Sequence, residues 1–223
     1  MELMSAVISG NERWEKLLHY NMTCMGGFMG TYAVCGFEGN FASAQTGNLM
    51  SMTKALVGGD IREMLLRIGA LVVFSISMAV SHILSHSIAR KSMRRLCLWV
   101  DLAGLLAAAA APAVWHSVLR LYPIFIAASF QWGTYSGAGG YSSASIFSTN
   151  NLKQAVISWT DYIVYHEESA RSRASFYTLT VLSFVTGALG GCASVAAWGN
   201  RAALCGLVLL LTAWVMTARE EGR

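Results

Sequence analysis

Residues 29–50 have the sequence MGTYAVCGFEGNFASAQTGNLM, and residues 132–153 have the sequence WGTYSGAGGYSSASIFSTNNLK. The two stretches align without a gap at an offset of 103 residues (132 − 29 = 103), and seven of the 22 aligned positions are identical. The identities include a shared Gly-Thr-Tyr near the start and a shared Asn-Leu near the end. Self-similarity at one fixed offset indicates a repeated structural unit, so we expect a chain built from two similar halves.

The chain around these stretches follows the same order in both halves. Each stretch overlaps the end of an apolar run and leads to a polar segment, Lys54–Arg67 in the first half and Asp161–Arg173 in the second. Two further apolar runs follow each polar segment. We therefore place the internal repeats at about residues 15–115 and 118–219, within a single membrane domain of residues 1–223.

The composition is that of a membrane protein, with 55% hydrophobic and 13% charged residues. A helix that crosses the hydrocarbon core of a bilayer needs roughly 20 apolar residues. Six runs come near this length, at residues 20–37, 68–89, 96–114, 121–138, 174–198 and 202–218. The predicted fold class is therefore an all-α integral membrane protein with six transmembrane helices.

The polar stretch in each half predicts a re-entrant half-helix. Residues 42–57, ASAQTGNLMSMTKALV, are short for a crossing and include Gln45, Asn48 and Lys54. A half-helix that enters the membrane and returns leaves three crossings in each half, and an odd number makes the two repeats inverted. The alternative is that both polar segments cross fully, which gives eight spans.

The positive charges favour six spans, with the N- and C-termini in the cytoplasm. Both arrangements place 10 Lys and Arg residues inside and 5 outside. Eight spans, however, would export the cluster RKSMRR at residues 90–95, and short loops follow the positive-inside rule most closely. The first 19 residues lack the basic-then-apolar order of a cleaved signal peptide, so we expect the first membrane helix to direct targeting.

The breaks before the half-helices predict a site. Non-helical backbone at membrane depth has to be buried in protein or line a wet cavity, because unpaired N–H and C=O groups are too unfavourable in lipid. Glycine supplies the permissive backbone for such breaks, at Gly36 and Gly39 in the first half and at Gly137, Gly139 and Gly140 in the second.

Two half-helix N-termini would then meet near the midplane, where their free N–H groups suit an anion or the electronegative end of a polar molecule. We expect Ser43 or Thr46 to cap the first half-helix and Ser148 or Thr149 to cap the second. The predicted substrate-binding residues are Ser43, Gln45, Thr46, Asn48, Ser148, Thr149, Asn150 and Asn151. The alternative is that the amide side chains only tie helices together.

Two acidic residues are candidates for coupling solute passage to protons or cations. Asp101 lies within an apolar run, where an acid is unfavourable and often functional; a salt bridge with Arg94 or Arg95 at the inner interface is the alternative. Glu38 lies in the first break, and its counterpart in the repeat is Tyr141, so its role would not be symmetric.

No residue pattern predicts a metal site, a cofactor or an enzyme. His82 and His86 share a helix face at i, i+4 spacing, but no third metal ligand is evident. No nucleophile–base pair or phosphate loop occurs. The five cysteines fall in apolar runs without metal-ligand or redox spacing, and we interpret them as small buried hydrophobic residues. The basic residues gather where a cytoplasmic loop would be, which indicates topology and excludes nucleic acid as a partner.

Two pairs of glycines at i, i+4 spacing predict close helix packing. They are Gly26 with Gly30 and Gly187 with Gly191. The packing would lie either within one chain or between the protomers of a homo-oligomer.

The stretch GGFMGTYAVCGFEGNFASAQTGNLM, followed by FQWGTYSGAGGYSSASIFSTNNLKQ, resembles the YoaK-like family of bacterial multi-pass membrane proteins, a domain of unknown function. The resemblance covers nearly the whole chain and implies about six membrane helices in the bacterial inner membrane. Many members have an Asp where Gly30 stands, in a GGFLDAY-like stretch. If that acid couples protons or cations in relatives, Glu38 or Asp101 would have to replace it here.

We expect a membrane transporter or channel that passes a small polar or anionic solute through a central site at the two breaks. The alternative function is a non-transporting membrane scaffold or sensor whose polar segments are structural. The expected partners are the lipid bilayer and the solute.

Overall fold

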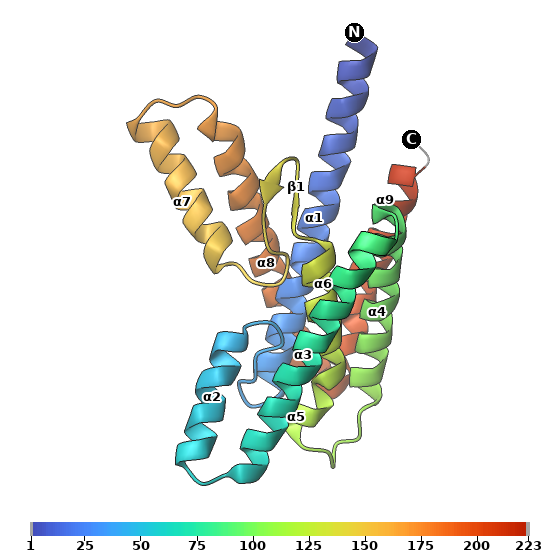
Figure 1. Cartoon of the computed structure of the whole chain (residues 1–223), viewed down its shortest axis with the longest axis vertical. Coiled ribbons are helices and arrows are strands. Elements are labelled where there is room, and N and C mark those ends of the chain that lie inside the picture. The colour runs from blue at the N-terminus through green and yellow to red at the C-terminus, as the bar shows by residue number, and fades with distance from the viewer. Residues whose placement is uncertain (1, 222–223) are drawn as a thin grey trace.

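The computed structural model describes residues 2–221 and the side chains of residues 12–219. Over that range the chain is helical apart from its connections and one two-stranded antiparallel ladder. Figure 1 shows a long helical bundle with two helical hairpins that lean out on one side. The all-α prediction is confirmed.

The first half contains four helices. They are α1 (Glu2–Gly36), α2 (Gln45–Val57), α3 (Ile61–Ser87) and α4 (Arg90–Ala110). Between α1 and α2, residues 37–44 form the first break. The carboxylate of Asp60 caps α3 by accepting a hydrogen bond from the backbone N–H of Glu63 (2.9 Å). α4 ends just before Pro112, as a proline requires of the residues that precede it.

The second half repeats this order of elements. It contains α5 (Ser117–Arg120), α6 (Tyr122–Thr134), β1 (Gly137–Ala138), β2 (Tyr141–Ser142), α7 (Thr149–Val164), α8 (Ala170–Trp198), the 3-10 helix η1 (Gly199–Cys205) and α9 (Gly206–Glu221). Residues 135–148 form the second break, so α6, α7, α8 and α9 follow one another as α1, α2, α3 and α4 do.

The apolar run 121–138 does not form one long helix, because α6 ends at Thr134. Gly139 and Gly140 connect β1 to β2, and both have positive φ (58° and 79°), as the central residues of a type I′ hairpin turn require. With 13 residues, α6 is roughly 20 Å long at 1.5 Å per residue. That is shorter than the roughly 30 Å hydrocarbon core of a bilayer.

The first helix of each half packs against the third and fourth helices of the other half. α1 contacts α8 and α9, whereas α6 contacts α3 and α4. Within the halves, α2 packs on α3 and α7 packs on α8. Exchanging the two halves leaves this pattern of neighbours unchanged.

Glycines set the close approach of α1 and α8. A Cβ at Gly187 would lie 1.8 Å from the carbonyl oxygen of Cys24, and a Cβ at Gly27 would lie 2.1 Å from the carbonyl oxygen of Phe184. Gly191 also faces α1. The pair Gly187 and Gly191 therefore serves packing within one chain.

Two helical stretches of the described chain are long and apolar enough to cross a membrane, Ile61–Ser87 and Ala170–Arg219. Only 22% and 33% of their apolar windows are buried inside the protein, whereas the core helix of a soluble protein would be mostly buried. Along α3, large apolar side chains face outward at Val72, Ile76, Val80 and Ile83. These stretches support the membrane prediction by length, composition and exposure; six spans in inverted repeats remain a prediction.

The two half-length helices diverge from the middle of the molecule. In Figure 1, α2 and α7 both begin near the middle of the long axis and run to opposite ends. The start of α1, the end of α9 and the α3–α4 connection lie toward the same end of that axis.

Candidate solute site at the two chain breaks

Both breaks rest on α1, one turn apart. A Cβ at Gly26 would lie 2.1 Å from the carbonyl oxygen of Ser145 in the second break. A Cβ at Gly30 would lie 3.9 Å from the Oγ of Ser43 in the first break. Because residues four apart share a helix face, the breaks meet on one side of α1. The pair Gly26 and Gly30 therefore contacts the two breaks of its own chain.

Asn48 and Asn151 fasten each break to the half-helix that follows it. The Nδ2 of Asn48 donates to the carbonyl oxygen of Phe41 (2.8 Å), and its Oδ1 accepts from the N–H of Phe41 (3.2 Å). The Nδ2 of Asn151 donates to the carbonyl oxygen of Ala144 (2.8 Å). Phe41 and Ala144 are also 103 residues apart (144 − 41 = 103), so the repeat preserves the bond. These buried amides are engaged in closing the breaks.

The second break contains a buried hydrogen-bonded chain that ends on α1. The Oγ of Ser143 donates to the Oδ1 of Asn151 (2.9 Å) and lies 3.0 Å from the Nε2 of His19. Because the hydroxyl proton is already donated, Nε2 carries the hydrogen and donates to Ser143. The Nδ1 of His19 is then an acceptor, and this buried atom has no hydrogen-bond partner among the described residues.

Gln131 joins α6 to the same region. Its Nε2 donates to the carbonyl oxygen of Met22 (2.8 Å) and to the Oγ of Ser145 (3.1 Å). Its Oε1, like the Nδ1 of His19, is a buried acceptor without a hydrogen-bond partner. Two hydrogen-bond acceptors thus flank the second break, and sequence analysis missed both because neither lies in the repeated polar stretch.

The other predicted site residues lie around the starts of the half-helices. Ser43 is buried, Gln45 and Ser148 are partly buried, and Thr46, Thr149 and Asn150 are exposed. The Nε2 of Gln45 and the Oγ of Ser148 have no hydrogen-bond partner. Among the described residues, the predicted site residues of the first half make hydrogen bonds only within the first half, and those of the second half only within the second. α1 nevertheless contacts both breaks.

The predicted N-caps are wrong in chemistry and partly in position. α2 begins after Ala44, so neither Ser43 nor Thr46 is its cap. Ser148 occupies the N-cap position of α7, but its hydroxyl makes no capping hydrogen bond. The side chains that hold the first turns are Asn48 and Asn151, which reach back into the breaks.

Glu38 lies at the end of α1 in an exposed, left-handed conformation (φ 54°). Its Oε2 accepts a hydrogen bond from the Oγ of Ser117 (3.2 Å). It faces a cavity of about 340 Å³ that is lined by Glu38, Ser51, Lys54, Ala55, Gly58, Asp60, Glu63 and Arg67. Glu38 thus belongs to a charged vestibule beside α2 and α3.

Asp101 is completely buried in α4. The Sγ of Cys97 lies 3.8 Å from its Oδ2, and within the part of the chain that the structure describes its Oδ1 has no hydrogen-bond partner. Arg94 instead lies 3.4 Å from Glu15. The alternative of a salt bridge between Asp101 and Arg94 or Arg95 at the inner interface stays a prediction.

A charged cluster at the opposite end from the vestibule ties the hairpin to α1 and α4. The Oε2 of Glu15 accepts a hydrogen bond from the N–H of Gly139 at the hairpin tip (3.1 Å), and its Oε1 pairs with Arg90 and Arg94. Burial alone would raise the pKa of Glu15, but the Gly139 N–H and the two guanidinium groups outweigh burial and lower it. No local sequence signal links residues so far apart.

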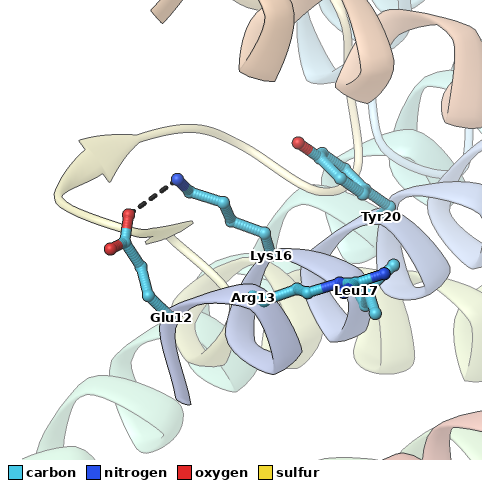
Figure 2. A pocket seen from close by; sticks show the side chains of 5 residues that line it. All are labelled: Glu12, Arg13, Lys16, Leu17 and Tyr20. Atoms are coloured by element: carbon cyan, nitrogen blue, oxygen red, sulfur yellow. Dashed lines mark hydrogen bonds and ion pairs between the residues drawn. The ribbon is translucent and has the colours of Figure 1, made fainter. Parts of the chain in front are cut away.

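A cavity of about 280 Å³ lies beside this cluster, lined by Glu12, Arg13, Lys16, Leu17 and Tyr20. Figure 2 shows Lys16 extending along the hairpin with its ammonium against Glu12, and the Nζ–Oε1 distance is 2.7 Å. A Cβ at Gly139 would lie 2.1 Å from the Cε of Lys16, so the lysine side chain would have to move, and the positive φ of 58° also favours glycine at the hairpin tip.

His82 and His86 are exposed neighbours with ring centroids 4.6 Å apart. Within the described part of the chain, no group of three or more His, Cys, Asp or Glu side chains could hold a metal ion.

Comparison with known proteins identifies one family. The family described as protein of unknown function (DUF1275) matches residues 18–216, which confirms the expected likeness to an uncharacterised family. No curated protein and no solved structure matches the chain.

Proposed function

We propose that this chain, which belongs to that family of proteins of unknown function, passes a small polar or anionic solute across a membrane. The observation that carries the proposal is the seating of both breaks on consecutive turns of α1, at Gly26 and Gly30. From there the two half-helices run to opposite ends of the molecule (Figure 1). Broken helices that meet near the midplane are where transporters with repeated folds bind their solutes.

The neighbours of each helix support two inverted three-span repeats in this proposal. α1 and α6 exchange equivalent partners between the halves. α2 and α7, with 13 and 16 residues, are as long as α6 and α9, so length alone does not mark them as half-helices. What supports that assignment is that α2 and α7 each begin after a break near the middle of the long axis (Figure 1). We therefore propose six crossings and two re-entrant helices, with residues 90–95 and both termini on the cytoplasmic side of a bacterial inner membrane.

The polar atoms at the second break narrow the class of solute. The Nδ1 of His19 and the Oε1 of Gln131 are buried acceptors, whereas the first turn of α7 offers N–H donors. In the first turn of α2, the N–H groups of Gln45, Gly47 and Asn48 already donate to backbone carbonyl oxygens. A solute that both donates and accepts hydrogen bonds would satisfy both kinds of group. This favours a polar molecule with N–H or O–H groups over a simple inorganic anion.

Reconstitution into liposomes tests the proposal. Flux of a panel of small anions and neutral polar metabolites would be compared for the wild type, Thr149→Val and Thr160→Val. Both threonines are exposed on α7, but Thr149 lies at the break and Thr160 near the far end. Loss of one hydrogen bond, worth about 0.5–1.5 kcal/mol, should lower the flux of a transported probe about three- to tenfold in Thr149→Val only.

The outcomes distinguish an error in the assigned site residues from an error in the proposed transport function. Equal flux in all three proteins would remove Thr149 from the site while leaving transport intact. If no probe shows protein-dependent flux, the transport proposal is wrong.

Asp101 is the proposed coupling residue, because it is a buried acid whose Oδ1 has no hydrogen-bond partner. Glu38, which faces the vestibule, is the second candidate. For a transported probe, Asp101→Asn should abolish acceleration by a proton gradient, whereas unchanged acceleration would exclude Asp101 from coupling.

A non-transporting scaffold or sensor is the second candidate function. It is favoured by Asn48 and Asn151, whose amides are occupied by hydrogen bonds within their own breaks. If the breaks are purely structural, Asn48→Leu and Asn151→Leu should destabilise the protein while no probe crosses the liposome membrane even with the wild type.

A further inference from the structure

Two cysteines that are distant in sequence lie side by side on the surface of the helical bundle. The Sγ of Cys35 on α1 is 3.0 Å from the Sγ of Cys192 on α8. Both residues are exposed, whereas Cys97 is buried and Cys24 and Cys205 are partly buried. The interpretation of all five cysteines as buried hydrophobic residues is therefore wrong for this pair, which 157 residues of sequence separate.

The two backbones hold the thiols at this separation. Close to the pair, the Oγ1 of Thr31 donates to the carbonyl oxygen of Ala188 (2.8 Å), and Gly36 lies against Val195. The glycine contacts at Gly187 continue the same helix–helix seam. A disulfide needs an S–S distance of about 2.05 Å, so a movement of about 1 Å between the sulfur atoms would form the bond.

The pair lies near the ends of both helices. Cys35 directly precedes Gly36, the last residue of α1, and Cys192 lies six residues before Trp198, the last residue of α8 (198 − 192 = 6). In the proposed topology, these helix ends face the outer side of the membrane. Disulfides form and persist there, because that side is separated from the reducing cytoplasm.

We propose that Cys35 and Cys192 are a redox-active pair that closes to an intramolecular disulfide by exchange with an external disulfide. One thiolate attacks a sulfur of the oxidant and releases the first thiol. The second thiolate then attacks the mixed disulfide, forms the Cys35–Cys192 bond and releases the second thiol. The pair loses two electrons and two protons, and the oxidant is reduced to two thiols.

The disulfide would join α1, which seats both breaks, to α8. The equivalent helices of the other pair, α6 and α3, contain no cysteine, so only one of the two equivalent helix pairs has this link. Oxidation would therefore restrain α1 against α8 while α6 and α3 stay unlinked.

The test treats the reduced, purified wild-type chain with oxidised glutathione, denatures it, and measures intact mass and maleimide labelling without reductant. We expect a monomer that has lost two hydrogen atoms, has three labelled cysteines in place of five, and regains all five after dithiothreitol. Peptide mapping should place the link between Cys35 and Cys192. The oxidised form should unfold at a higher temperature than the reduced form.

Two variants control the assignment. Cys35→Ser should carry a glutathione on Cys192 and form no internal link, and Cys24→Ser, on the same helix, should oxidise like the wild type. Five reactive thiols, only mixed disulfides, or only intermolecular dimers in the wild type would overturn the proposal. Because no readout involves flux, this failure is distinct from failure of the transport proposal.

Discussion

The amide of Asn151 makes the densest set of hydrogen bonds within the second break. It donates to the carbonyl oxygens of Ala144 and Phe147 and accepts from Ser143. Asn151→Leu removes these bonds and leaves buried polar groups unpaired, so we expect the free energy of unfolding to fall by about 1–3 kcal/mol.

The exposed neighbour Asn150 provides the control, because Asn150→Leu should stay within about 0.5 kcal/mol of the wild type. Thermal unfolding in one detergent would measure both variants. Equal stability of the two would show that Asn151 does not hold the break.

Glu15 should make stability depend on pH. Its pKa is lowered in the folded protein, so the charged carboxylate stabilises the fold at pH values above its ordinary value of 4.5. That contribution is lost as the pH falls from 4.5 through the folded pKa. Glu15→Gln should therefore flatten the decline in unfolding temperature below pH 4.5.

Glu12→Gln is the matched control for Glu15→Gln, since Glu12 lies nearby on α1 but has a more exposed side chain (45% against 18%). It should retain the wild-type decline. A Glu15→Gln profile that follows the wild type would show that the Gly139 and arginine contacts do not stabilise the carboxylate.

The equivalence of residues in the two repeats could be predicted from the sequence, whereas their hydrogen-bond partners could not. Asn48 and Asn151 align at the offset of 103 residues, so the sequence alone indicates a shared role. Their acceptors are backbone carbonyls, which carry no sequence signal. His19, Gln131 and the pair Cys35–Cys192 escaped prediction because only the packing of α1 against other elements gives them their partners.

At the scale of elements, glycine positions on α8 decide how close α1 can come. A Cβ at Gly187 would lie 1.8 Å from the backbone of Cys24, whereas a Cβ at Gly190 meets no atom within 4 Å. Gly187→Ala should therefore lower the free energy of unfolding by about 1–3 kcal/mol through overpacking.

Gly190→Ala, three residues further along the same helix, should raise the free energy of unfolding by about 0.5–1 kcal/mol, because alanine is the better helix former. Thermal unfolding of the two variants measures the difference. An equal rise in the free energy of unfolding of both variants would mean that helix propensity and not the α1–α8 contact governs this face.

Periodic apolar runs predicted the helices better than their ends. Residues 121–138 are apolar throughout, yet the helix stops at Thr134 because Gly139 and Gly140 form a hairpin turn. Likewise, the run 202–218 begins as a 3-10 helix and becomes α-helical only at Gly206. Hydropathy reports burial in lipid or protein, and backbone conformation within an apolar run depends on local glycines and tertiary contacts.

At the scale of the whole molecule, the six-span and eight-span arrangements differ in the side of the membrane on which each connection between helices lies. With the N-terminus inside, six spans place residue 60 outside and residue 92 inside, and eight spans reverse both. The start of α1 and the end of α9 lie toward the same end of the long axis as the α3–α4 connection (Figure 1). The α2–α3 connection near residue 60 lies at the other end.

Cysteine labelling in intact spheroplasts tests this arrangement, with Asp60→Cys or Ser92→Cys placed in a chain whose five native cysteines are replaced by alanine. Both positions are exposed, so a membrane-impermeant maleimide can reach either one from its own side. We expect Asp60→Cys to react in intact spheroplasts and Ser92→Cys to react only after lysis, because short loops rich in Lys and Arg, such as residues 90–95, tend to stay in the cytoplasm. The opposite pattern would make α2 and α7 full spans and remove the re-entrant helices on which the proposed site depends.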